Sequence, residues 1–367
     1  AARNQAALHG AALVGFARLG PPLNAGERLD LAQAWRWAGF DDRAAPLLEG
    51  LDLPDAQALR QRVARETSSH AFASVEAAED RDDLRTRVTT LGVGWRPAPG
   101  ALAEVRVRSL SLDYPADSPS SAQLQGLLRW RLGEPTAPRG TLWPTLALRI
   151  MRFGDWQAVT GSARATWVPR DRWRLDADAG RELVETPLAI ANRVHVDTWS
   201  LGVDHRPRPG LAWAASAAAL RFDDGNLRRR MTARVEHRLR PAPRWTVGAE
   251  GQHFESSDPA VVGGVGYRGY WNPRRYEEWR LFAAFAAERG AWDLYGRIGL
   301  GGARETNGDG VTTQGTPHLW ELRVGHDLSP TVRLGVAAGG SGSGLGLAGG
   351  GSGYWRRYLN LSVSGWF

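Results

Sequence analysis

From Ser68 to Phe367, apolar and polar side chains alternate along the sequence in one segment after another. The last of these segments shows the pattern most clearly, because Leu359, Leu361 and Val363 are each followed by a polar residue. A period of two places successive side chains on opposite faces of a β-strand. The sequence therefore predicts strands with one apolar and one polar face.

The alternating segments can be counted. They lie at 70–79, 84–97, 101–114, 121–133, 142–153, 157–169, 172–185, 193–206, 210–223, 227–240, 243–256, 277–288, 291–304, 316–328, 331–341 and 355–367. Sixteen strands lie within the range of bacterial outer-membrane barrels, and an even number places both ends of the chain on the same side of the membrane. We predict a mainly β fold, a sixteen-stranded antiparallel transmembrane β-barrel over residues 68–367.

Composition agrees with a barrel in the bacterial outer membrane. No apolar stretch reaches the roughly 18 residues of a transmembrane helix, and the mean hydropathy is −0.37. The 17 Trp residues suit aromatic belts at lipid boundaries. The chain has no Cys, which excludes disulfides and cysteine-based metal sites. Its net charge of +7 is not gathered in a run, so nucleic acid is not an expected partner.

The connections between predicted strands fall into two sets. Short connections rich in Pro and Arg lie at 96–100, 169–171, 206–210, 240–243 and 328–330. Long loops lie at 115–120, 186–192, 257–276, 305–315 and 342–354. Outer-membrane barrels have short periplasmic turns and longer outer loops. We therefore expect the short turns, Phe367 and the N-terminal residues on the periplasmic side. A propeller, the soluble alternative, would show a fixed blade period, which this sequence lacks.

Aromatic residues follow the same division. Outward Trp residues beside the short turns are expected to form a periplasmic girdle, and they are Trp95, Trp173, Trp213, Trp245 and Trp292.

Residues 1–67 have a helical pattern instead. Asn24 and Glu27 form a capping-box sequence at the start of one helix. The segment 31–44 resembles a tetratricopeptide repeat, with Gly39 between two helices and the small Ala44 after it. Because such solenoids need about three repeats, we expect residues 1–67 to be the C-terminal end of a longer periplasmic solenoid. A generic helical hairpin packed on the barrel is the alternative.

Sequence motifs for catalysis are missing. The eight His residues show no metal-ligand spacing, and no nucleophile elbow or phosphate loop is present. His195 with Asp197, or His253 with Ser256 and Ser257, could supply parts of a hydrolase site, but polar residues at a barrel rim are the simpler interpretation. We expect no enzymatic activity, no catalytic residue, no metal and no cofactor.

The polar inner face of the barrel is the candidate site. Its mixed charges, with a small positive bias, suit a hydrated neutral or weakly charged polymer. The predicted lumen and polymer-path residues are Arg106, Arg129, Arg131, Arg174, Asp176, Arg234, Glu250, Arg280, Arg297, Glu321, Arg323 and Tyr358. The alternative is that these charges pair with one another and only maintain the shape of the barrel.

The loop 257–276 is the second candidate, since it is the longest connection and unusually aromatic. Its predicted outer-mouth residues are Tyr267, Tyr270, Trp271, Arg274, Arg275 and Tyr276. Aromatic rings stack on sugar rings and Arg donates to hydroxyls. The loop is therefore expected either to gate the pore or grip an emerging polymer, or to pack against neighbouring loops.

Tetratricopeptide-like helices followed directly by such a barrel resemble the outer-membrane exporters of synthase-dependent exopolysaccharides. That group includes the C subunit of bacterial cellulose synthesis and the poly-N-acetylglucosamine export porin. The segment 266–276 looks like the Gly-Tyr-aromatic-x-Pro-x-x-Tyr element of the group, and 221–226 looks like its Asp-Gly-Asn hairpin.

This resemblance implies a function. It implies export of a cellulose-like or poly-N-acetylglucosamine-like exopolysaccharide from periplasm to cell surface during biofilm matrix formation. The implied partners are the polysaccharide chain, outer-membrane lipid and lipopolysaccharide, and an inner-membrane synthase complex reached through the repeats. A general diffusion porin or small-solute channel remains an alternative, as does an outer-membrane barrel hydrolase.

Overall fold

The computed structural model describes residues 9–20, 23–115, 118–260, 268–342, 350 and 353–367. Its helices are α2 (His9–Leu19), α3 (Ala25–Trp37), α4 (Asp41–Leu48), α5 (Pro54–Thr67) and α6 (Pro187–Ala191). Its strands are β1 (His70–Asp80), β2 (Arg85–Trp95), β3 (Leu102–Asp113), β4 (Ser120–Arg129), β5 (Leu132–Gly133), β6 (Thr141–Phe153), β7 (Trp156–Arg170), β8 (Trp173–Leu183), β9 (His195–Arg208), β10 (Leu211–Phe222), β11 (Leu227–Pro241), β12 (Arg244–Ser256), β13 (Arg275–Arg289), β14 (Trp292–Thr306), β15 (Thr312–Gly315), β16 (His318–Ser329), β17 (Val332–Ser341) and β18 (Arg356–Trp366).

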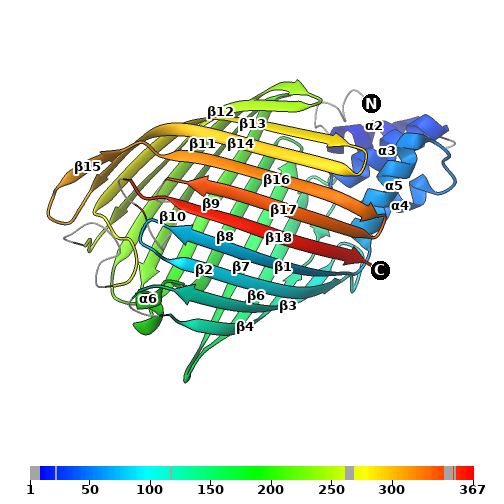
Figure 1. The fold of residues 1–367 in the computed structure, drawn as a ribbon. Coiled ribbons are helices and arrows are strands. Elements are labelled where there is room, and N and C mark those ends of the chain that lie inside the picture. Colours follow the sequence, from blue (N-terminus) through cyan, green and yellow to red (C-terminus); the bar gives the residue numbers. More distant parts are fainter. Residues whose placement is uncertain (1–8, 21–22, 116–117, 261–267, 343–349, 351–352) are drawn as a thin grey trace.

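The long strands form a closed barrel (Figure 1). Each pairs antiparallel with the next, and β1 also pairs with β18, which closes the sheet. Within the described residues the sheet has eighteen strand segments. Two of them, β5 and β15, have only two and four residues and extend the edges of β6 and β14. The remaining sixteen build the wall, which confirms the predicted sixteen-stranded antiparallel barrel.

The two faces of the wall differ as the alternation predicts. On β18, Leu359, Leu361 and Val363 point outward and are 47%, 51% and 40% exposed. Their neighbour Tyr358 points inward, where its hydroxyl donates to Glu321 on β16 at 3.4 Å. A continuous exposed apolar belt is unfavourable in water and favourable against lipid. The outer face is therefore the membrane-facing surface.

One predicted strand and two predicted loops differ from the structure. The predicted strand 121–133 stops at Arg129, and β5 follows as a separate short segment. The predicted loop 186–192 contains α6, because the side chain of Thr186 accepts a hydrogen bond from the backbone of Ala189 and Pro187 occupies the first turn. The predicted loop 305–315 contains β15.

The N-terminal helices pack on one another around small residues. The predicted capping box forms, because Asn24 and Glu27 each accept a hydrogen bond from the other's backbone. Gly39 has φ +82°, and a Cβ there would lie 2.8 Å from the ring of Trp143 on β6. Ala44 is fully buried between helices. Gly39 thus allows the helices to approach β6 closely, and Ala44 allows them to pack closely on one another. None of the described helices is long and apolar enough to cross a membrane.

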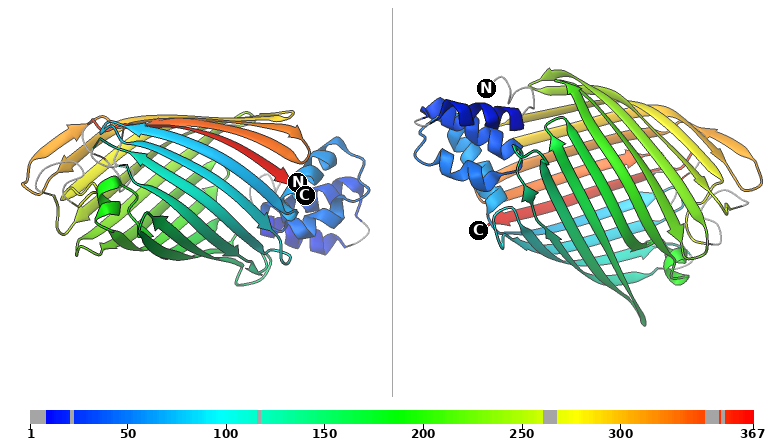
Figure 2. Two further views of the ribbon diagram at one scale, coloured as in Figure 1. Left: turned by 60° about the horizontal axis from the view of Figure 1, so that its bottom comes forward. Right: turned by 180° about the vertical axis from the view of Figure 1, so that it is seen from behind.

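The two ends of the barrel are unlike (Figure 2). The helices α2 to α5 and the chain's C-terminus lie at one end, which we call the helix end. The loop that carries α6 and the hairpin with β15 lie at the other, which we call the loop end. Trp95, Trp173, Trp245 and Trp292 are exposed and begin or end strands at the helix end, and Trp213 packs edge-on against Trp173.

Candidate functional site

The alternation places eleven of the twelve predicted lumen residues on the inner face of the wall. Their strand neighbours in sequence, such as Val105, Leu281, Ile298 and Leu322, are exposed on the outer face. The eleven inner residues are Arg106, Arg129, Arg174, Asp176, Arg234, Glu250, Arg280, Arg297, Glu321, Arg323 and Tyr358. The exception is Arg131, which follows β4 at the helix end.

A charge cluster crosses β12, β13 and β14. Glu250 forms an ion pair with Arg280 at 3.0 Å and accepts a hydrogen bond from Arg297 at 2.6 Å. Arg280 also pairs with Glu278 at 3.1 Å, and the hydroxyl of Tyr276 donates to Glu278 at 2.6 Å. Because removing one partner of a buried ion pair leaves an uncompensated charge, this cluster holds the three strands in register. These side chains support the wall more than they offer free groups to a solute.

Other inner charges are open to the lumen. Asp176 accepts from Arg174 at 2.9 Å and from the hydroxyl of Thr166 at 2.5 Å, and Arg234 pairs with Glu236. The side chain of Arg174 remains 54% exposed. Arg174, Asp176 and Arg234 line a hollow of about 530 Å³ on the inner wall, which reaches from β7 to β13. This part of the lumen offers both donors and acceptors to a hydrated solute.

Paired acidic and basic side chains also lie on the other side of the lumen. Arg323 donates from Nε to Glu321 at 2.6 Å, and its side chain is 61% exposed. Arg106 pairs with Glu104 and lies over the ring of Phe72. The inner wall is thus a mixed-charge surface on which acid and base alternate.

Arg131 holds the helical segment instead of facing an open lumen. Its two Nη atoms donate to the two oxygens of Asp42 at 2.8 and 2.9 Å, and Nη1 also donates to the carbonyl of Gly39 at 3.1 Å. The guanidinium lies 3.7 Å from the centre of the Phe40 ring. This hydrogen bonding holds the pKa of Asp42 below its ordinary value. Arg129, nearby, lies over the ring of Trp143.

Further contacts join the helical segment to turns at the helix end of the barrel. Arg65 on α5 pairs with Asp327 at 2.9 Å and donates to the carbonyls of Ser329 and Pro330 in the β16–β17 turn. Halfway round the ring of strands, the β7–β8 turn is held as well.

In that turn, the carboxylate of Asp171 accepts from the backbone of Gly10 at 2.6 Å and of Ala11 at 3.0 Å. Since turns on opposite sides of the ring are tied to one helical segment, the helices lie across part of the helix-end mouth.

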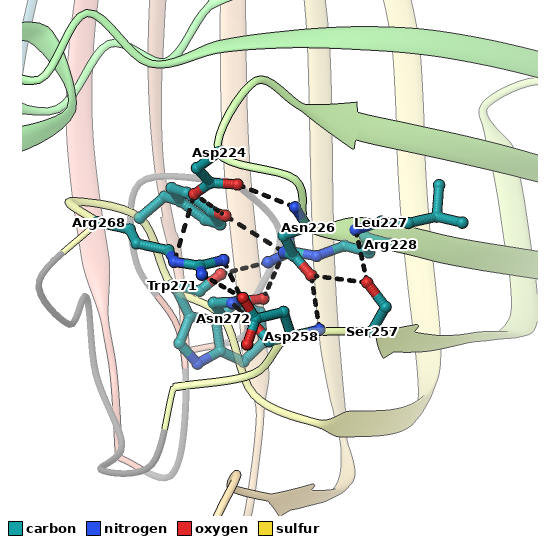
Figure 3. A network of polar contacts seen from close by, with 10 residues as sticks. Asp224, Asn226, Leu227, Arg228, Ser257, Asp258, Arg268, Trp271 and Asn272 are labelled. Carbon is teal, nitrogen blue, oxygen red and sulfur yellow. Dashed lines mark hydrogen bonds and ion pairs between the residues drawn. The ribbon is translucent and has the colours of Figure 1, made fainter.

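The loop end contains a packed shelf inside the barrel mouth, formed by residues 268–272 (Figure 3). Tyr270 is fully buried and stacks on Phe222 at 4.1 Å, and its hydroxyl donates to Asp224 at 2.7 Å. Asn226 donates to the hydroxyl of Tyr270 at 3.2 Å and to Oδ1 of Asn272 at 3.0 Å. The two segments that resemble family elements, 221–226 and 266–276, therefore contact each other.

The rest of the shelf is equally enclosed. Trp271 is fully buried, packs edge-on against Phe254 and Tyr276, and donates to Glu305 at 3.3 Å. Arg228 donates to the carbonyl of Trp271 and lies 4.5 Å from the centre of the Phe254 ring.

Neighbouring residues fix the position of the shelf. Gly269 has φ +83°, its carbonyl accepts from Thr186, and a Cβ there would overlap the backbone of Ala189 in α6. Arg268 pairs with Asp224 and Asp258.

These contacts bear on the outer-mouth prediction. The rings of Tyr270 and Trp271 are covered by protein, so in this conformation they offer no face to a sugar, and the contacts favour the packing alternative. Arg274 donates to the carbonyl of Gly308, and Arg275 pairs with Glu277. Tyr267 lies outside the described residues. Asp224, Asn226 and Arg228 are network members that the sequence analysis did not identify, although the Asp-Gly-Asn hairpin pointed to their position.

The candidate hydrolase residues do not assemble into a catalytic set. His195 faces Asp223 at 3.4 Å, whereas Asp197 pairs with Arg181 at 3.0 Å. His253 lies 3.5 Å from Glu255 and Glu277. Among the described residues there is no group of three or more His, Cys, Asp or Glu that could hold a metal ion.

Comparison with known proteins adds a family match. Residues 139–276 match the family model of the PgaA membrane beta barrel domain. A solved structure described as a bacterial polysaccharide outer membrane secretin is similar, with a TM-score of 0.64 and 11% sequence identity over 82% of this chain and 99% of that chain. No match is found among curated protein sequences.

Two further solved barrels have lower scores. OccK7 from Pseudomonas aeruginosa has a TM-score of 0.42 and 12% identity over 82% of this chain and 98% of its own. CdiB from Acinetobacter baumannii has a TM-score of 0.49 and 10% identity over 81% of this chain and 60% of its own. The fold and the family match confirm the bacterial outer membrane as the location and confirm the predicted resemblance to exopolysaccharide export porins.

Proposed function

We propose that this outer-membrane β-barrel, similar to the PgaA barrel domain over residues 139–276, exports a secreted exopolysaccharide from periplasm to cell surface. The polymer would be cellulose-like or poly-N-acetylglucosamine-like in backbone and would contribute to a biofilm matrix. In this proposal the chain has no catalytic role.

The observation that carries the proposal is the way the helical segment is joined to the barrel. Short turns mark the periplasmic end of an outer-membrane barrel, so the helix end faces the periplasm. The Arg131–Asp42 and Arg65–Asp327 pairs hold the helices directly at that entrance. Residues 1–67 then serve as the end of a periplasmic repeat segment that receives the polymer and contacts a synthase complex, and residues 68–367 serve as the channel.

The wall supports the same conclusion. On opposite sides of the lumen, Arg174 and Arg323 present exposed donors, and they pair with Asp176 and Glu321. Such groups exchange hydrogen bonds with successive sugar hydroxyls without binding any one sugar tightly. A general diffusion porin is the second candidate, but it has no need for helices held across its periplasmic mouth.

Deletion of the gene in its source bacterium tests the proposal. We expect extracellular polysaccharide to fall to background and to return with the wild-type gene on a plasmid, while uptake of small solutes stays unchanged. Normal polysaccharide secretion together with reduced solute uptake would favour the diffusion porin.

A further inference from the structure

The contacts between the helices and the barrel are spread unevenly round the helix-end mouth. Hydrogen bonds and ion pairs from the helices reach Asp171, Asp327, Arg96, Glu134 and Glu288. Between described residues, no hydrogen bond or ion pair joins the helices to the β9–β10 turn or the β11–β12 turn. A polymer that enters beside the helical segment would therefore pass these two turns.

Beside these two turns lies a hollow of about 320 Å³ whose charged residues are mostly arginines. We call it the basic hollow, defined by Arg172, Arg206, Arg208, Arg238 and Arg244. All five side chains belong to exposed residues, at the ends of β8, β9, β11 and β12.

Acidic residues neutralise only part of the basic hollow. Glu236, the acid that also borders it, pairs with Arg234, and Asp204 lies 3.6 Å from Arg206. Within the part of the chain that the structure describes, no carboxylate forms an ion pair with Arg208, Arg238 or Arg244. Clustered like charges of this kind repel one another and attract anions.

The turns that carry these arginines are tied together. The backbone of Arg206 donates to the carbonyl of Arg172 at 3.0 Å, and Arg172 donates from Nη1 to the carbonyl of Pro207 at 2.6 Å. The backbone of Arg238 donates to the carbonyl of Gly210 at 2.6 Å. The cluster therefore stands on a connected scaffold, so little ordering would be required when an anion binds.

From this arrangement we propose that the basic hollow is the entry site for the exported polymer and that this polymer carries carboxylate groups. The inference rests on the proposed export function and adds a substrate class to it. Guanidinium groups bind carboxylates through two parallel hydrogen bonds. The mixed-charge wall beyond the hollow, where Arg174 pairs with Asp176, offers less net charge, so an acidic chain is attracted at the entrance and released along the lumen.

The test is binding of defined hexasaccharides to the purified full-length chain in a neutral detergent, measured by isothermal titration calorimetry. The probes are hexagalacturonate, which is acidic, and cellohexaose, which is neutral. We expect hexagalacturonate to bind at least about tenfold more tightly than cellohexaose, and its affinity to fall as salt is raised, as for other charge-steered contacts.

The double variant Arg238→Glu and Arg244→Glu isolates the hollow. It should weaken hexagalacturonate binding by about tenfold or more, since each change replaces an attraction with a repulsion. The matched control is Arg139→Glu with Arg289→Glu, which makes the same charge change at exposed helix-end positions outside the hollow and should leave binding unchanged. Thermal unfolding of both variants checks that the barrel remains folded.

Three results would overturn the inference. These are equal affinity for the two hexamers, an unchanged affinity in the Arg238→Glu and Arg244→Glu variant, and an equal loss in the control. Tight binding of cellohexaose alone would remove the acidic polymer and leave export intact. Normal polysaccharide secretion after gene deletion would instead remove export itself, so the two failures are distinguishable.

Discussion

At the residue scale, the junction between the helices and the barrel contains Asp41, a carboxylate whose charged form is disfavoured by its surroundings. Burial, together with the negative charge of the neighbouring Glu66, raises the pKa of Asp41 to about 6. Because this folded-state value lies above the ordinary value of 3.8, the folded protein loses stability as pH rises from about 4 to about 6, and the full cost is present above pH 6. The pKa of the adjacent Asp42 is instead lowered, because Arg131 donates hydrogen bonds to its carboxylate.

Asp41→Asn tests this assignment. At pH 7.5 it should stabilise the docked helices by about 1–3 kcal/mol, the order set by two pKa units at a partly exposed site. Near pH 3 the gain should largely vanish, because Asp41 is then mostly protonated in both the folded and the unfolded state. Hydrogen exchange of α4 at the two pH values, corrected for intrinsic rates, measures the difference. An equal gain at both values would mean that the charge of Asp41 is not the cause.

At the scale of elements, the strands were predictable and their contacts were not. The alternation located the strands because lipid and lumen impose opposite polarity on successive residues, and this constraint acts on each segment independently. The shelf at 268–272 depends on residues far apart in sequence, such as Asn226 and Tyr270, which no local pattern connects. For the same reason Arg131 was predicted to face the polymer path, whereas its partner Asp42 lies in a helix.

The tight packing of the shelf leads us to expect that adding one methyl group at Gly269 changes stability and conductance. Gly269→Ala introduces a Cβ that overlaps the backbone of Ala189. It also places a residue with a side chain at a positive φ, which is strained. We expect the barrel to lose about 1–3 kcal/mol of stability and to show larger or unsteady single-channel conductance in planar bilayers. Gly126→Ala is the control, because no atom lies within 4 Å of its Cβ. Steady wild-type conductance in Gly269→Ala would mean that the shelf does not restrict the mouth.

At the scale of the whole molecule, the helix end must face the periplasm for export to proceed outward. The chain has no Cys, so single-cysteine variants report topology without background. Asp309→Cys, exposed at the loop end, should react with a membrane-impermeant maleimide on intact cells. Ala98→Cys, exposed in the β2–β3 turn at the helix end, should react only after the outer membrane is opened. The reverse labelling pattern would contradict the orientation.

If the polymer travels through the lumen, blocking the lumen must stop its secretion. Arg323→Cys places a thiol on the inner wall, where the side chain is 61% exposed, and Leu322→Cys places one on the lipid-facing side of the same strand. Both variants are modified with a bulky thiol reagent in secreting cells, and extracellular polysaccharide is then measured against the extent of modification. We expect secretion to stop in Arg323→Cys and to continue in Leu322→Cys. Continued secretion from fully modified Arg323→Cys would contradict passage through the lumen.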